Sequence, residues 1–362
     1  MCSIGPEAAC DRRYVSFEVV SREILRHNPL NAVTAVVERV SDADGHTLIR
    51  KELRRPDLPS TEGTAGAWAA STDPEHWNYW RREADAYLSR PLRDGLQVAG
   101  LDIANADVEE TDAGVVLWLE DVAGTPGTEF SIDDHAAVAA ALGRWHAQGP
   151  LSETWVSHRF LRDYSASKPA RYELVENDAA WEQPLIASCW PPALRDGWRR
   201  LLANRETLLT VMESLPRTRS HLDVWVSNEI RRPNGPIVLL DWAFTGDGAI
   251  GEDLGNHVPD AVFDLFWPAE RLVELDDACF NEYVHGLHEA DWQGDEREVR
   301  LGVVASCVKY AWLLPRLLES AAASSHQAYH QIADSEYLYQ QRGAALMHLV
   351  TWCDEALRLA TD

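Results

Sequence analysis

The segment from Ser220 to Trp242 gathers the side chains of this sequence that are best suited to chemistry. It reads as a polar loop, a hairpin, and a buried strand over 237–240 that ends at Asp241. Asp223 and Asn228 lie in the loop before the hairpin. Two carboxylates and one amide are therefore close in sequence, at the ends of elements that can position them.

The turn of the hairpin decides how these groups meet. Asn234-Gly235 is a strong signal for a tight β-turn, and a hairpin centred on this pair places Asn228 opposite Asp241. Pro233 and Pro236 flank the turn and lack N–H groups, so the loop can be wider than two residues. A symmetric widening keeps the same pairing, and we expect Asn228 and Asp241 to share one site.

Oxygen atoms from Asn and Asp are suitable ligands for Mg²⁺, which substrate phosphates and water then complete. Asp223, a third carboxylate with no metal to hold, could accept a proton from an attacking hydroxyl. This combination is suited to phosphoryl transfer. The alternative is a polar loop that happens to precede a core strand.

A lysine on the apolar face of an expected strand supplies a second signal. Ile49, Lys51 and Leu53 share one strand face, and a lysine that points inward needs an anionic partner. Only three of the 33 basic side chains are lysines, at positions 51, 168 and 309, so a lysine here suggests that a compact ammonium is required. Glu83, on a following helix, is the expected partner. The alternative is a solvated basic run through Arg50 and Lys51.

The order His221-x-Asp223-x-x-x-x-Asn228, followed by Asp241, resembles the catalytic segment of the aminoglycoside phosphotransferase and choline kinase branch of protein-kinase-like enzymes. The resemblance implies that Asp223 is the catalytic base and that His221 braces its loop. It also implies that Asn228 and Asp241 hold Mg²⁺.

The same resemblance implies an ATP site. Lys51, held by Glu83, would contact the nucleotide phosphates, and the adenine would bond to the hinge backbone at the Glu120 carbonyl and the Val122 N–H. The acceptor would lie between the catalytic loop and the C-terminal helices.

Two residues and one connection depart from the family pattern. Leu222 stands where relatives often have glycine, and Ala243 stands where many have a second acid after the metal-binding Asp. The connection over 26–31, expected to cover the phosphates, contains no glycine. Asp247, Glu252 or Asp253 could replace the missing acid, although Asp253 is better placed to bond backbone N–H groups of the loop.

The expected fold is α+β and bilobal, like that of protein kinases. Residues 1–120 would form a nucleotide-binding lobe with a five-stranded sheet plus a helix, and residues 121–362 a helical lobe with the catalytic loop and acceptor site. The strands are expected at 17–25, 32–40, 46–53, 101–109 and 114–119, and a helix is expected to begin at Asp73-Pro74-Glu75.

Composition limits the partners. A formal net charge of −25 argues against nucleic acid and anionic membrane surfaces. The six cysteines form no C-x-x-C pair, which fits a reducing cytosol and gives no zinc site. No signal peptide and no run of membrane-spanning length is recognisable, so we expect a cytoplasmic protein.

Lys168 reads as a surface loop residue, His146 as a packed histidine, and Lys309 as core or groove lining.

The sequence thus predicts an ATP- and Mg²⁺-dependent kinase that moves the γ-phosphoryl group to a hydroxyl of a small molecule, aminoglycoside-like or another metabolite. One alternative is a kinase of peptide Ser or Thr, or of a natural-product intermediate, working with a pathway partner enzyme. Another is a nucleotide-binding pseudokinase or scaffold, which the glycine-free connection and Ala243 would favour.

Overall fold

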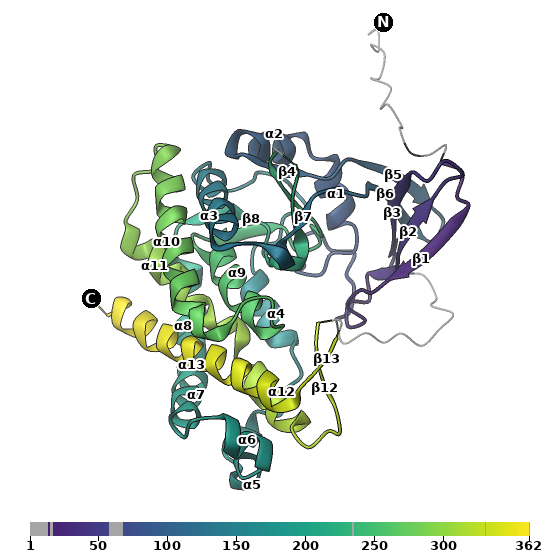
Figure 1. The fold of residues 1–362 in the computed structure, drawn as a ribbon. Coiled ribbons are helices and arrows are strands. Elements are labelled where there is room, and N and C mark those ends of the chain that lie inside the picture. Colours follow the sequence, from purple (N-terminus) through teal and green to yellow (C-terminus); the bar gives the residue numbers. More distant parts are fainter. Residues whose placement is uncertain (1–13, 15–16, 58–67, 234, 330, 362) are drawn as a thin grey trace, which may run out of the picture.

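The computed structural model describes residues 14, 17–57, 68–233, 235–329 and 331–361, and it has two parts (Figure 1). A five-stranded antiparallel sheet lies at one end of the molecule, and helices make up most of the rest. The expected bilobal α+β architecture is therefore confirmed. The sheet has the order β1 (Ser21–Leu25), β2 (Thr34–Ser41), β3 (Thr47–Arg54), β6 (Gly114–Glu120) and β5 (Ala106–Thr111).

Strand β3 is central in this sheet, paired with β2 on one side and β6 on the other. Lys51 and Leu53, two residues apart on one face of this strand, are both buried. Helices α1 (Arg82–Leu88) and α2 (Arg90–Ala99) follow, and both bury apolar side chains against the rest of the protein. Lys51 is thereby held on the covered face of the sheet.

The strand expected at 101–109 is interrupted. Leu101–Ile103 (β4) leaves the first sheet and pairs in parallel with β10 (Ile237–Leu239), in a second sheet of order β4-β10-β9-β7. The other members are β9 (Glu229–Arg231) and β7 (Thr125–Pro126). The second sheet joins a segment from the first 120 residues to the hairpin that ends at Asp241.

The helix expected to start at Asp73 begins only at Arg82, and α2 was not expected. The side chain of Arg82 is fully buried and donates to four backbone carbonyls, those of Pro74, His76, Trp77 and Trp155, at 2.8 Å each. Three of these carbonyls belong to the segment that would have formed the first helical turns. Their bonds to Arg82 hold this segment in turns instead.

The helical part surrounds one large apolar core. Its elements are α3 (Ile132–His146), α4 (Phe160–Ser167), α5 (Asp178–Trp181), α6 (Pro184–Cys189), α7 (Ala193–Ala203), α8 (Arg205–Ser214), β8 (Arg217–Ser220), β11 (Gly246–Ala249), α9 (Glu252–Phe263), α10 (Leu272–Glu289), α11 (Glu296–Ala305), α12 (Leu313–Ser320), β12 (His326–Ala328), β13 (Gln331–Ala333) and α13 (Ser335–Leu359).

Helices α3 and α10 approach so closely that only glycine fits at their contact. A Cβ atom at Gly143 would lie 2.2 Å from the Tyr283 carbonyl oxygen, and one at Gly286 would lie 2.0 Å from that of Ala140. This contact brings His146, at the end of α3, next to Tyr283 of α10.

Within the described part of the chain, one helical stretch, Glu296–Ser320, is long and apolar enough to cross a membrane, contrary to the expectation that no run has membrane-spanning length. Within its most apolar window, 78% is buried inside the protein. The stretch comprises α11, α12 and the 3-10 turn between them, and it packs as core of the helical part.

Candidate active site

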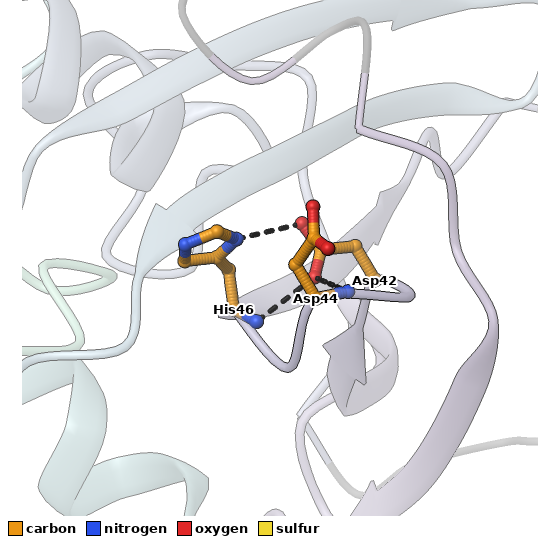
Figure 2. A group of neighbouring side chains, drawn as sticks. All are labelled: Asp42, Asp44 and His46. Carbon is orange, nitrogen blue, oxygen red and sulfur yellow. Dashed lines mark hydrogen bonds and ion pairs between the residues drawn. The ribbon is translucent and has the colours of Figure 1, made fainter.

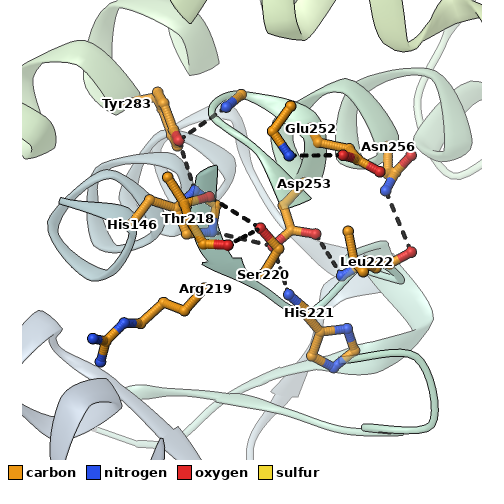
Figure 3. Close-up of polar contacts among 12 residues, drawn as sticks. His146, Thr218, Arg219, Ser220, His221, Leu222, Glu252, Asp253, Asn256 and Tyr283 are labelled. Atoms are coloured by element: carbon orange, nitrogen blue, oxygen red, sulfur yellow. Dashed lines mark hydrogen bonds and ion pairs between the residues drawn. The ribbon is translucent and has the colours of Figure 1, made fainter. Parts of the chain in front are cut away.

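The loop 220–228 is fixed by one carboxylate from α9 (Figure 3). Asp253 accepts hydrogen bonds from the backbone N–H groups of His221 (2.8 Å) and Leu222 (2.7 Å), and from His146 Nε2 (3.1 Å). His146 is in turn bonded to the Tyr283 hydroxyl at 2.6 Å. The side chain of Asp253 is completely buried, so α3, α9 and α10 together hold the start of this loop.

His221 uses both ring nitrogens inside the protein. Nε2 donates to the carbonyl of Leu240 (3.0 Å), and Nδ1 accepts from the N–H of Asp223 (3.3 Å). Burial lowers the pKa of the imidazole below its usual value. Because the ring is neutral and both of its nitrogens are hydrogen-bonded within the protein, His221 links the loop to the hairpin and does not act as a proton carrier.

Leu222 adopts the left-handed conformation, with φ of 67°. Relatives often have glycine at this position, and the backbone geometry explains the preference. Here the leucine side chain is fully buried in an aromatic cluster with Trp68, Trp77, Phe160 and Phe244. Ala243 lies in the same cluster, so the expected second acid is replaced by an apolar contact.

The predicted pairing of Asn228 with Asp241 is wrong by one residue. Leu239 pairs with Glu229, and Leu240 donates its N–H to the Asn228 carbonyl (2.8 Å), so Asn228 lies opposite Leu240. The last hydrogen bond before the turn runs from the Arg232 N–H to the Pro236 carbonyl (3.2 Å). The loop therefore has three residues, 233–235, and not an even number. Asn234 itself lies outside the described residues. The assumption of symmetric widening was therefore incorrect.

Asp241 still reaches the site because its own backbone turns, with φ of 60°. Its Oδ1 lies 3.0 Å from Lys51 Nζ, and Glu83 Oε2 lies 2.6 Å from the same ammonium. Burial alone would lower the pKa of Lys51, but Asp241 and Glu83 outweigh it and raise that pKa. Lys51 in turn holds the pKa of Asp241 below its usual value, against the effect of burial. The structure thus joins Lys51, Glu83 and Asp241 in one hydrogen-bonded group across the two parts. Burial raises the pKa of Glu83 to about 7, which Lys51 partly counteracts.

Asn228 is hydrogen-bonded to Asp223. Its Nδ2 donates to the Asp223 carbonyl (3.0 Å) and to Asp223 Oδ2 (3.1 Å), which leaves the amide oxygen for a cation. The Asp241 side chain is 44% exposed and turns one oxygen toward Lys51. Hard oxygen donors from an ionised carboxylate and an amide fit the preferences of Mg²⁺.

Asp223 lies where two cavities meet. A cavity of about 790 Å³ contains Lys51, Asp241, Asn228 and Asp223 in its wall. A second, of about 400 Å³, is bounded by α9, α12 and the 3-10 turn over 306–310. Asp223, Tyr164, Trp225 and Asp264 line both cavities. Burial raises the pKa of the Asp223 carboxyl to about 7, which Lys309 partly counteracts.

The first cavity also contains the two segments expected to bind nucleotide. The connection over 26–31 lines it, held by the Asn28 side chain, which accepts from Leu30 N (3.0 Å), and by that of Asn31, which accepts from Val33 N (3.1 Å). Asparagine side chains thus shape the turn that glycines shape in relatives. Glu120 and Val122 line the same cavity at the junction of the two parts. The Glu120 carboxylate itself is bound to Arg232, at 2.6 and 2.9 Å.

Neither Asp247 nor Glu252 lines the first cavity. Asp247 pairs with Arg217 (3.2 Å) on another face, and Glu252 accepts from Ala249 N (2.9 Å). Asp253 organises the loop, as the sequence suggested.

The expectation that Lys168 is a surface residue is wrong. Lys168 is only 8% exposed, and its ammonium lies among aromatic rings. Sequence reasoning also assigned no role to Asp260, Asp264, Tyr164 or the β12–β13 hairpin, which contributes Gln327, Ala328 and Tyr329 to the first cavity. The rarity of lysine in the sequence is a signal that applies to Lys168 and Lys309 as well as to Lys51.

A separate group of Asp42, Asp44 and His46 lies at the turn between β2 and β3 (Figure 2). Asp42 accepts from Asp44 N (3.0 Å), His46 N (2.9 Å) and His46 Nδ1 (3.0 Å). These bonds account for the group as a turn closed by an aspartate side chain, so we assign no metal to it.

Comparisons with known proteins agree with this geometry. A model of the phosphotransferase enzyme family matches residues 103–294, more than half of the chain. No curated protein matches. A solved amicoumacin kinase, in complex with AMP-PNP, Ca²⁺ and Ami, aligns with a TM-score of 0.52 and 14% identity, covering 92% of this chain and 89% of that one. An aminoglycoside phosphotransferase from Alicyclobacillus acidocaldarius subsp. acidocaldarius DSM 446 aligns with a TM-score of 0.50 and 14% identity, covering 100% and 98%. At this identity, both structures support the fold alone.

Proposed function

The chain belongs to the phosphotransferase enzyme family, and from this premise we propose that it transfers the γ-phosphoryl group of ATP, with Mg²⁺, to a hydroxyl of a small molecule. The observation that carries the proposal is the position of Asp223. Its carboxylate lies between a cavity with the Lys51, Glu83 and Asp241 group and a second cavity large enough for a small acceptor.

Lys51 orients the phosphates of ATP in the larger cavity, and Glu83 keeps the ammonium in place. Asn228 and Asp241 are the residues that would hold Mg²⁺, and the bound ion would neutralise charge on the phosphates. The backbone at Glu120 and Val122 is our candidate for contact with the adenine.

Asp223 receives the acceptor hydroxyl from the smaller cavity. The hydroxyl oxygen forms a bond to the γ-phosphorus, the bond from that phosphorus to the β–γ bridging oxygen breaks, and ADP leaves. The hydroxyl proton passes to the Asp223 carboxylate, whose pKa of about 7 suits this transfer near neutral pH. Asn228 and His221 fix the position of Asp223 but do not exchange protons in this scheme. In such transfers, positioning and electrostatics supply most of the rate enhancement.

The volume of the second cavity, about 400 Å³, fits a small acceptor. The same residues argue against a scaffold without activity, because the base, the two oxygen ligands and the inward lysine are all present and contact one another as a site. Cellular location and any pathway partner stay predictions.

Thermal unfolding with and without Mg-ATP tests the nucleotide site. At 100 times its Kd, the nucleotide should stabilise the protein by about 2.7 kcal/mol. Lys51→Met and Asp241→Asn should lose most of this stabilisation, whereas Asp277→Asn, an exposed aspartate remote from both cavities, should keep it. No stabilisation of the wild type would reject the proposal. Stabilisation without ADP release over a broad panel of alcohols would favour the inactive scaffold.

A further inference from the structure

The turn of the connection between β1 and β2 offers no free backbone N–H group. Pro29 has none. The N–H groups of the four residues that follow it are all bonded within the protein, in chain order to Asn28 Oδ1 (3.0 Å), the Asn28 carbonyl (3.2 Å), the Trp68 carbonyl (3.1 Å) and Asn31 Oδ1 (3.1 Å). Glycine-rich loops bind phosphates through such N–H groups. This turn has used them to hold its own shape.

Two basic side chains at the start of the same connection line the larger cavity. Arg26 is exposed and His27 is half-buried, and both belong to the cavity wall. No hydrogen bond or ion pair joins either side chain to a residue that the structure describes. Their N–H groups are therefore free to bind a ligand in this cavity.

The strand register places this pair near Lys51. Strands β1, β2 and β3 lie side by side (Figure 1). Leu25 pairs with Val37, and Val37 pairs with Lys51, so the three residues form one row across the sheet, and all three line the larger cavity. The spacing of neighbouring strands puts Leu25 about 10 Å from Lys51. Arg26 follows Leu25 directly, so its side chain and that of Lys51 can meet on one chain of phosphates.

The charges of the larger cavity favour the same assignment. Lys51 is opposed by two carboxylates, at 2.6 and 3.0 Å, and Arg39 is bound to Asp121 (2.8 Å). Among the arginines and lysines in the described wall of this cavity, Arg26 alone has no carboxylate partner. Mg-ATP keeps a net negative charge after the metal is bound, so its phosphates need a cation beyond Lys51.

We propose that the side chains of Arg26 and His27 bind the phosphates of ATP, in place of the backbone N–H groups of a glycine-rich loop. This inference rests on the proposed function and specifies how the same site holds its nucleotide. The guanidinium of Arg26 donates paired hydrogen bonds to phosphate oxygens, and His27 adds one N–H that needs no positive charge. The absence of glycine from the connection is then no sign of lost nucleotide binding.

Isothermal titration of the full-length protein tests the proposal with two probes. Mg-ATP carries the phosphates, and adenosine has the same base and ribose without them. The variants are Arg26→Met, Arg26→Lys and the double variant Arg26→Met/His27→Leu. Arg22→Met is the matched control, because Arg22 lies four residues earlier on the same strand, is bound to Glu38 (2.7 Å) with 49% of its side chain exposed, and does not line the cavity.

We expect Arg26→Met to raise the Kd of Mg-ATP about tenfold, and the double variant to raise it further. Arg26→Lys should keep part of the affinity, and Arg22→Met all of it. The Kd of adenosine should stay unchanged throughout. A wild-type Kd for Mg-ATP in the double variant, or equal losses for Mg-ATP and adenosine, would overturn the inference. No binding of Mg-ATP by the wild type would instead reject the proposed function, so the two failures are distinguishable.

Discussion

Two leucines have left-handed backbone conformations, with φ of 67° at Leu222 and 66° at Leu265. Both conformations cost about 1–2 kcal/mol relative to glycine, which has no Cβ. Leu222, within loop 220–228, has a fully buried side chain, whereas Leu265, just beyond the end of α9, is half-buried. The two sites therefore share the backbone strain and differ in how much packing the side chain provides.

Glycine substitutions should separate these two contributions. Leu222→Gly removes a core side chain, which typically costs 2–5 kcal/mol, so we expect a net loss of about 1–4 kcal/mol despite the relieved strain. Leu265→Gly should leave the free energy of unfolding nearly unchanged or raise it by up to about 1 kcal/mol. Urea unfolding measures both. Equal losses at the two sites would mean that packing of Leu222 in the aromatic cluster is not what compensates its backbone.

At the scale of elements, the site depends on a strand, a loop and a helix that meet at Asp253. Strand β8 leads into loop 220–228, and the first turn of α9 presents Asp253 to two N–H groups of that loop. Helices α3 and α10 supply His146 and Tyr283 behind it (Figure 3). Asp253 acts on the reaction through Asp223, as a positioning residue.

Asp253→Asn replaces one acceptor oxygen by an amide that cannot accept a backbone N–H. We expect the free energy of unfolding to fall by about 1–3 kcal/mol, and kcat to fall while nucleotide affinity is kept. Glu252→Gln is the matched control, because this neighbouring buried carboxylate bonds Ala249 N instead of the loop. Loss of nucleotide affinity in Asp253→Asn, with kcat unchanged, would contradict the positioning role.

The sequence identified the segments that form the site more accurately than it predicted their contacts in the fold. Local spacing identified the 220–241 segment, the inward Lys51 and its partner Glu83, because these depend on strand alternation and a short motif. The hairpin register was missed because the closing bond uses the Pro236 carbonyl, which leaves three residues in the loop. The late start of α1 was missed because it depends on the Arg82 side chain, which binds three carbonyls of the preceding turns and that of Trp155, far along the chain.

Lys168 shows the same limit. Its neighbours in sequence, Ser167 and Pro169, are typical of an exposed loop, whereas the rings that enclose it come from positions 68, 164 and 312. The contacts with Trp68 and Trp312 are long-range and have no local signature.

At the scale of the whole molecule, three helices of the helical part meet at one buried carboxylate. Asp276 of α10 accepts from Arg300 of α11 (2.8 Å), and from His348 (3.1 Å) and Trp352 (2.7 Å) of α13. Burial would raise the pKa of Asp276, but His348 and Arg300 lower it to about 2, from an ordinary value of 3.8.

A depressed pKa stabilises the folded state above the ordinary pKa, and this contribution is lost as the pH falls toward the folded value. Asp276 should therefore contribute about 2 kcal/mol at neutral pH, and this contribution should disappear between about pH 4 and pH 2. The difference in free energy of unfolding between wild type and Asp276→Asn should narrow over that range. Asp277→Asn, next to it but exposed, should show no such dependence. A difference that stays constant with pH would refute the linkage.

The role of Asp223 is tested most directly by turnover of Asp223→Asn, measured as ADP release with the best acceptor found, beside Mg-ATP affinity measured on the same preparation. We expect kcat to fall by about 10²–10⁴ because the hydroxyl proton loses its acceptor, while Mg-ATP affinity stays close to that of the wild type. Turnover equal to that of the wild type and of the Asp277→Asn control would contradict the assignment of Asp223 as the base at the junction of the two cavities.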